Sequence, residues 1–135
     1  MKHSVESMLD IVSVHKPDAW ATGTHNSAAI DTIRFSEEAF FVKVGTVGSG
    51  TVTVHIEESD DGSTGWTNIT GATTATLSSD NDEARIALRS EVHKRYIRAV
   101  AVVATGAVDF SVDMVKTVFD QTSALTSTWI KPAAS

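Results

Sequence analysis

One stretch near the middle of the chain limits the possible folds more than any other. Between Thr51 and Ser59 polar and apolar residues alternate, with valine or isoleucine at every second position up to residue 56. This period of two is that of a β-strand with one buried face. Turn-forming residues flank the strand on both sides, at residues 48–50 and 60–62. The chain therefore contains an antiparallel sheet.

The neighbouring segments predict two hairpins. Residues 40–44 form a short apolar run, and we expect it to pair antiparallel with residues 51–58 across the glycine turn. Residues 96–103 turn at 105–107 into Val108–Val118, where apolar and polar positions alternate again. The whole chain contains about seven or eight short strands at spacings of roughly ten residues, without a convincing amphipathic helix between them. This pattern predicts an all-β sandwich or barrel.

Composition excludes several classes of function. The 135 residues suit one domain with its own hydrophobic core. The chain has no cysteine, which excludes disulfides, thiolate catalysis and cysteine-ligated zinc and favours a reducing compartment. A net charge of -6 disfavours binding to nucleic acid. We find no apolar run long enough for a membrane span and no apolar core of a secretion signal at the N-terminus.

The two ends of the chain depart from the strand pattern. Residues 1–18 fit a helix or an extended arm, which either packs across its own domain or docks on a neighbouring subunit. Residues 119–135 resemble a linker but carry Trp129 and Ile130, so this tail is either frayed or reaches over a neighbour. We divide the chain into an N-terminal arm (1–18), a β-sandwich domain (19–118) and a C-terminal tail (119–135). The interface candidates are Met8, Leu9, Val12, Trp20, Trp129 and Ile130.

Three groups of residues suggest a reactive or metal site, and each has a better structural explanation. The glycine-rich residues 45–51 lack the lysine and the following helix of a phosphate-binding loop. The acidic residues 57–61 and 80–83 do not have the spacing of a calcium loop, and turns whose Asp side chains bond their own backbone explain them better. The five histidines show no metal-ligand spacing, and no nucleophile elbow occurs. We therefore expect no catalytic, cofactor or metal site and no enzyme.

The aromatic residues form a fourth group. Exposed aromatic rings on a β-sandwich can stack against sugar rings, which would make the chain a carbohydrate-binding module. More often such rings fill the core or anchor an interface. Residues 68–70 match a glycosylation acceptor, but without a secretion signal the match is accidental. The aromatic candidates are Trp20, Trp66, Tyr96 and Trp129.

Residues 52–71, VTVHIEESDDGSTGWTNITG, resemble a pattern found in small structural proteins of tailed-phage virions. The pattern is a strand, a turn of the form E-S-x-D-G-S, and then an aromatic residue and a glycine. Residues 95–98, which open a late strand, and residues 29–31, which follow a short apolar arm, continue the resemblance. Such proteins are jelly-roll or related β-sandwiches, and several are capsid cement or decoration proteins seated as oligomers on an HK97-type shell.

The resemblance implies a jelly-roll-like antiparallel β-sandwich with extended N- and C-terminal arms and with no catalytic residue or cofactor. It implies a capsid decoration (cement) protein that stabilises the head by binding the outer surface of the shell as a homo-oligomer, a trimer or dimer. The partner would be the major capsid protein of an HK97-type shell. The chain would be made in the host cytoplasm and located on the capsid surface of the virion. The alternatives are another virion part (tail, connector or head-fibre base), a carbohydrate-binding β-sandwich module and, last, an enzyme.

Overall fold

The computed structural model describes residues 9–118, and almost every element in this range is a β-strand. One short 3-10 turn, η1 (Ser90–Val92), interrupts the strands. The strands are β1 (Leu9–Trp20), β2 (Gly23–Asn26), β3 (Ile30–Asp31), β4 (Phe35–Val44), β5 (Thr51–Ser59), β6 (Thr67–Thr73), β7 (Glu83–Arg89), β8 (Tyr96–Ala104) and β9 (Val108–Val118).

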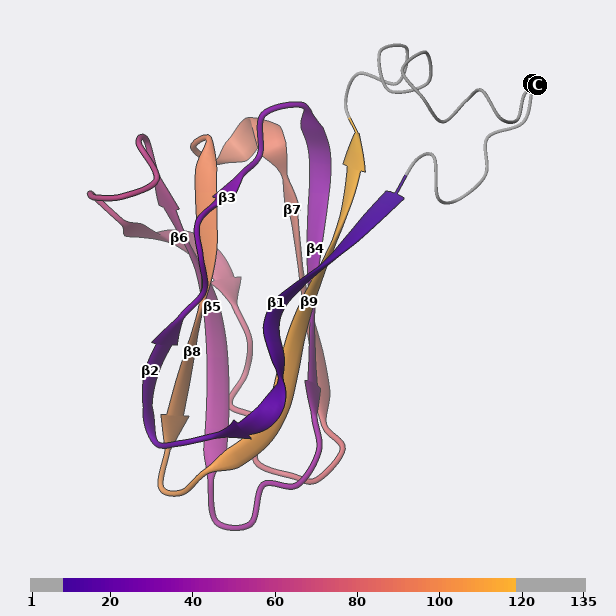
Figure 1. The fold of residues 1–135 in the computed structure, drawn as a ribbon, viewed down its shortest axis with the longest axis vertical. Coiled ribbons are helices and arrows are strands. Elements are labelled where there is room, and N and C mark those ends of the chain that lie inside the picture. Colours follow the sequence, from indigo (N-terminus) through magenta and orange to yellow (C-terminus); the bar gives the residue numbers. More distant parts are fainter. Residues whose placement is uncertain (1–8, 119–135) are drawn as a thin grey trace, which may run out of the picture.

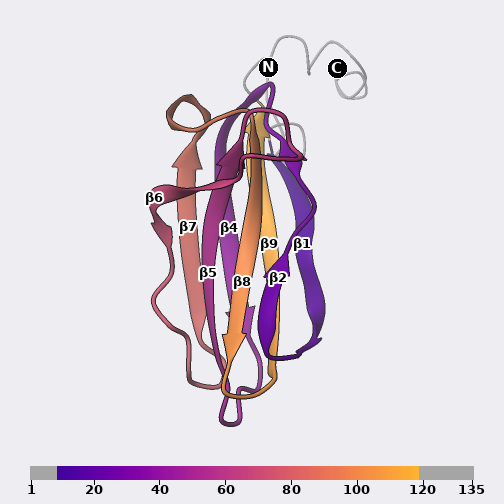
Figure 2. The same ribbon diagram turned by 90° about the vertical axis from the view of Figure 1, so that its left-hand side faces the viewer.

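Two antiparallel sheets pack face to face (Figure 1). Sheet A has the strand order β1-β9-β4-β7, and sheet B has the order β2-β8-β5-β6, with β3 pairing with β8. Seen from the side of sheet B, the long strands of both sheets run nearly parallel to the long axis of the molecule (Figure 2). The predicted all-β antiparallel sandwich of jelly-roll type is confirmed.

The core lies between the sheets and is built from alternate residues of the long strands. The central strand β5 has the two faces that its sequence predicts, because its valines and isoleucine are fully buried and its threonines are half-exposed. Burying each such side chain contributes about 1.5–3 kcal/mol to stability. The fully buried positions include Phe40, Val42, Val52, Val54, Ile56, Ile97, Val112 and Met114.

Both predicted hairpins are wrong. β4 lies in sheet A and β5 in sheet B, and β8 and β9 are separated in the same way. Each of these connections is an arch between the sheets, and β5 pairs instead with β8, from Thr51 opposite Ala104 to Ser59 opposite Tyr96. Alternation requires only that the apolar side of a strand faces a core. Two strands that face each other across a sandwich satisfy this condition as well as two neighbours in one sheet.

The sandwich includes residues 9–18, which are part of the predicted N-terminal arm. Residues 9–18 belong to β1, the edge strand that pairs with β9 along its length. Of the two alternatives for this segment, these residues follow the one in which it packs across its own domain, since Val12 and Val14 lie against the core. The pairing shifts between His15 and Asp18, where Pro17 lacks the N–H that a regular ladder needs.

The other candidate segments lie outside the described residues. These are residues 1–8, which include Met8, and residues 119–135, which include Trp129 and Ile130. Among residues 9–118, the structure has no helix with the length and apolar character needed to cross a membrane.

Candidate interaction surface

An apolar row crosses the outer face of sheet A. Ile11 of β1 lies opposite Val115 of β9, and Val115 lies opposite Ala39 of β4. Ala39 in turn lies opposite Ala87 of the edge strand β7. On each strand, the residue that follows or precedes the member of this row packs in or against the core, so the four side chains point outward; these core residues are Val12, Met114, Phe40 and Ile86. Ile11 is 69% exposed, which is the largest exposed fraction among the large apolar side chains of residues 9–118. We call these four residues the apolar row.

Small side chains hollow the sheet along this row. A groove of about 250 Å³ lies over β9, β4 and β7, where Ala39 and Ala87 leave space between larger neighbours. Its rim carries charge of both signs, from Glu37 and Arg89. The lining consists of Glu37, Glu38, Ala39, Ala87, Leu88, Arg89, Val115 and Thr117. A small apolar floor with a polar rim is the usual layout of a protein interface.

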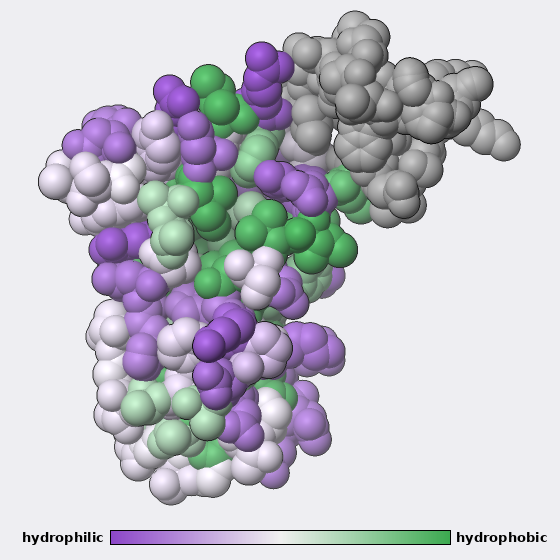
Figure 3. Space-filling model, in the orientation of Figure 1, coloured by the Kyte–Doolittle hydropathy of each residue, from purple (hydrophilic) through white to green (hydrophobic). Residues whose placement is uncertain are grey.

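The apolar row lies near the end of the sandwich at which β1 begins and β9 ends. Leu9 pairs with Thr117 there, and Phe35 pairs with Val118 (Figure 1). Two other exposed apolar side chains lie at this end: Ile33, in the loop before β4, is 54% exposed, and Val92, the last residue of η1, is 61% exposed. The space-filling view shows hydrophobic residues mainly on this upper half of the molecule (Figure 3). This end therefore offers an apolar surface beside the start of β1 and the end of β9.

The structure describes three of the predicted interface residues, Leu9, Val12 and Trp20, and separates Trp20 from the other two. Leu9 and Val12 are half-buried near the apolar row. Trp20 pairs with Val108 at the opposite end of β1, and its indole N–H donates to the carbonyl of Lys16 at 3.0 Å. The centroid of its ring lies 5.6 Å from the centroid of the Phe110 ring, so Trp20 closes an end of the core. The sequence does not predict the exposed members of the apolar row. They are aligned only by the register of four strands that are neighbours in the sheet but distant in sequence.

A buried ion pair lies at the same end of the molecule as the apolar row. The side chains of Glu38 and His93 are both completely buried, and Nε2 of His93 lies 2.8 Å from Oε1 of Glu38. The other ring nitrogen lies 2.7 Å from the carbonyl oxygen of Lys94. An ionised carboxylate and a carbonyl only accept hydrogen bonds, so beside ionised Glu38 both ring nitrogens donate, which favours the imidazolium form of the ring. Burial opposes this charge and is the largest single effect, but the hydrogen bonds to Glu38 and Lys94 and the charges of Glu38 and Glu58 together outweigh it, so the pKa of His93 is raised.

Ser90 completes this cluster but does not make it catalytic. Its hydroxyl donates to the second oxygen of Glu38, so the carboxylate lies between the serine and the histidine. A nucleophilic serine instead needs the imidazole beside its hydroxyl as a general base. The cluster therefore holds η1 and the following loop onto β4, and its chemistry is structural.

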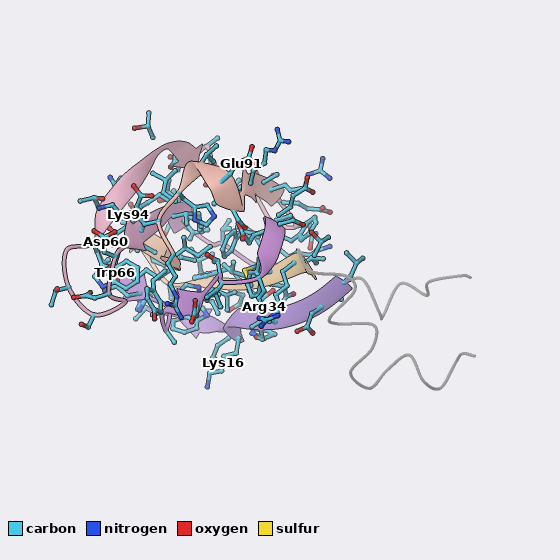
Figure 4. The ribbon with its side chains drawn as sticks, turned by 90° about the horizontal axis from the view of Figure 1, so that it is seen from above. Lys16, Arg34, Asp60, Trp66, Glu91 and Lys94 are labelled. Carbon is cyan, nitrogen blue, oxygen red and sulfur yellow. The ribbon has the colours of Figure 1, made fainter. Side chains whose placement is uncertain are left out.

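Trp66, a candidate for sugar stacking, lies on the side of sheet B. Seen from above, Trp66 lies well apart from Arg34 (Figure 4). The guanidinium carbon of Arg98 lies 4.4 Å from the centre of the Trp66 ring, and Arg98 also donates two hydrogen bonds to Glu57. A cation of the protein thus occupies one face of this half-buried indole.

The acidic turn after β5 has the structure that its sequence predicts. The carboxylate of Asp61 accepts hydrogen bonds from the backbone N–H groups of Thr64 and Ser63, both at 2.9 Å, and from the hydroxyl of Thr64. These bonds lower the pKa of Asp61, and the bond from the Thr64 backbone contributes most. The turn is therefore held by its own backbone. Among residues 9–118, no three His, Asp or Glu side chains gather closely enough to hold a metal ion.

Comparisons with known proteins give a likeness of fold. No protein-family model matches the chain, and no curated protein matches its sequence. PBSX exported protein XepA is 17% identical over 87% of this chain, with a TM-score of 0.63. A chain in the structure of infectious bursal disease virus Gx strain is 12% identical over 83% of this chain, with a TM-score of 0.54. This chain covers only 39% of the first protein and 33% of the second. The β-sandwich is thus a fold that this chain shares with parts of two larger proteins.

Proposed function

We propose that the chain is a structural component of a tailed-phage virion and acts by binding other proteins, without catalysis. The observation that carries this proposal is the apolar row, an uncovered face of sheet A among residues 9–118, beside the start of β1 and the end of β9. Support also comes from the resemblance of residues 52–71 to small virion proteins. A chain of similar fold occurs in the structure of infectious bursal disease virus.

The polar groups favour a structural role over an enzymatic one. An active site needs a nucleophile or a metal beside an acid or base in a cleft. Here the buried polar cluster of Glu38, Ser90 and His93 bonds to itself. The groove on sheet A has alanine and valine at its centre. Such a surface binds by shape and buried area.

In its specific form, the proposal is a capsid decoration or cement protein on the outer face of an HK97-type shell. The chain would bind the major capsid protein as a trimer or dimer. Terminal segments 1–8 and 119–135 would add interface area to a rigid domain. Repetition over the shell would give many weak contacts a high effective concentration. A net charge of -6 suits the outside of a DNA-filled particle, where the protein does not contact the genome.

Co-sedimentation with purified shells that lack the chain tests this function. We expect the wild-type chain to bind, and Ala87→Glu to bind at least about ten-fold more weakly, because it places a charge in the apolar row. Val102→Glu is the matched control, since Val102 is an exposed apolar residue of β8 in sheet B. Failure of the wild-type chain to bind shells would contradict the decoration role. Its recovery with purified tails or connectors would favour the other virion roles.

A carbohydrate-binding module is the second candidate. It is favoured by Trp66, whose half-buried ring lies beside the polar side chains of Arg98 and Glu57, as aromatic and hydrogen-bonding groups do in sugar sites. A glycan array tests it: defined hits that are lost on Trp66→Ala would support sugar binding, and an array without hits would remove it.

A further inference from the structure

We propose that the apolar row and its groove bind the C-terminal segment of a neighbouring copy of this chain, with Trp129 as the anchor. This inference rests on the assembly role proposed above and assigns a surface to it. Within residues 9–118 no element covers the outer face of sheet A, where Ile11 is 69% exposed. Burying it would remove an apolar patch from water, which favours association.

The row and the segment match in length. The row crosses four neighbouring strands, which lie about 4.8 Å apart, so it is about 14 Å long. In an extended segment, residues four positions apart share a face and lie about 13 Å apart. Leu125 and Trp129 have this spacing. An extended segment that crosses the strands would therefore place Leu125 beside Ile11 at one end and Trp129 over Ala87 at the other.

The groove suits an aromatic anchor at the Ala87 end. Ala39 and Ala87 form its floor, and its volume of about 250 Å³ is on the scale of one large side chain. Arg89 lies on the rim, where its guanidinium can lie over an indole ring. Tryptophan in a pocket with an arginine nearby is typical of the few residues that dominate interface energetics.

The direction of β9 favours a neighbouring copy as the source of the segment. β9 ends at Val118 opposite Phe35, three residues past Val115, and therefore runs away from its own row. Docking in its own groove would require the chain to reverse within residues 119–124, Phe-Asp-Gln-Thr-Ser-Ala, where only Asp120 and Ser123 are of turn-forming types. A segment that docks on an adjacent copy needs no such reversal. The seven steps from Val118 to Leu125 reach at most about 25 Å, so the neighbour must lie within that distance.

Crosslinking between single-cysteine copies tests the proposal, because the native chain has no cysteine to interfere. Full-length Ala39→Cys protein is mixed with full-length Ser127→Cys protein and treated with a short bis-maleimide. Residue 127 lies between residues 125 and 129 on the same face of an extended segment. We expect a crosslinked dimer. Adding Trp129→Ala should reduce its yield at least about ten-fold, whereas Ile130→Ala, on the opposite face, should leave it nearly unchanged.

The controls separate this proposal from its alternatives. Thr53→Cys, on the outer face of sheet B, replaces Ala39→Cys in a matched reaction and should give no dimer. Thermal unfolding checks that each cysteine variant folds. If Ala39→Cys does not fold, Ala87→Cys replaces it in the crosslinking reaction. Absence of a dimer would overturn the proposal. So would a chain carrying both cysteines that crosslinks only within a monomer, because the segment would then dock on its own domain.

The shell-binding assay distinguishes failure of this inference from failure of the proposed function. A wild-type chain that binds shells while its single-cysteine copies do not crosslink would overturn the docking proposal alone. A chain that crosslinks as expected but binds no shell would leave the docking site in place and contradict the decoration role.

Discussion

Two histidines give the stability of the sandwich opposite dependences on pH. His93 is held as an imidazolium by Glu38, so its pKa in the folded chain lies above the ordinary value of 6.5. His15 is buried without a hydrogen-bond partner for Nδ1, and burial lowers its pKa below 6.5. The folded chain therefore binds the proton of His93 more tightly than the unfolded chain does, and binds that of His15 less tightly.

The first prediction concerns His93→Gln. In the wild type, the stabilisation from protonated His93 is complete below pH 6.5 and is lost as the pH rises through the raised pKa. Removing one partner of a buried ion pair costs about 3–5 kcal/mol. His93→Gln should therefore lower the free energy of unfolding by roughly this amount at pH 6 and by less at pH 9. Urea denaturation at both pH values measures the difference. An equal loss at pH 6 and pH 9 would show that the ring is neutral.

The second prediction concerns His15→Phe and has the opposite sign. Below pH 6.5 the unfolded chain takes up a proton that the buried ring resists, so the wild type loses stability as the pH falls through the lowered pKa. The variant lacks this loss but also lacks the bond from Nε2 to the carbonyl of His25, worth about 1 kcal/mol. The variant should be less stable than the wild type at pH 8. At pH 5 this difference in stability should become smaller or change sign. Thermal unfolding at the two pH values provides the test, and a difference that does not change with pH would contradict it.

At the scale of elements, the sandwich depends on contact between two of the arches that connect its sheets. The loop between β4 and β5 meets the loop between β8 and β9 at Gly50, where a Cβ would clash with the carbonyl oxygen of Gly106 and lie 2.7 Å from Cγ2 of Val108. Neither loop is a hairpin turn. The glycine at position 50 is therefore required by a close approach of two backbones.

Gly50→Ala should destabilise the sandwich for this reason. Forcing a methyl group against a neighbouring backbone costs about 1–3 kcal/mol. The matched control is Gly48→Asn in the same loop: a Cβ there meets open space, and asparagine tolerates the positive φ of 52°. The control should lie within about 0.5 kcal/mol of wild type. Chemical denaturation measures both, and equal effects would show that the arches do not touch.

The sequence predicts individual strands well and their pairing poorly. The alternation in β5 identifies its buried face because burial acts on one strand at a time. The partner of β5 is β8, and nothing local in residues 40–44 distinguishes an arch from a hairpin. The Asp61 turn could be predicted because its hydrogen bonds join residues at most three positions apart. The Glu38–His93 pair could not be predicted, since 55 positions separate its members. The apolar row is hidden for the same reason, because its four residues meet only through tertiary pairing.

At the scale of the whole molecule, the sandwich and the C-terminal segment have separable roles. β9 ends at Val118, and its core residues Phe110, Val112 and Met114 lie well before that point. Deleting residues 119–135 should therefore change the free energy of unfolding by less than about 1 kcal/mol, while self-association weakens at least about ten-fold. Sedimentation velocity and thermal unfolding on the same samples measure the two effects. Unfolding of the shortened chain would show that the segment belongs to the core, and unchanged association would remove it from the interface.

This account depends on the claim that the chain is a component of a virion and functions by binding other virion proteins. The most direct test is quantitative mass spectrometry of purified particles produced from the genome that encodes it. The account predicts that the chain is present in a fixed ratio to the major shell protein and is retained after repeated washing. Absence of the chain from intact particles, while it is abundant in the infected-cell lysate, would contradict the account.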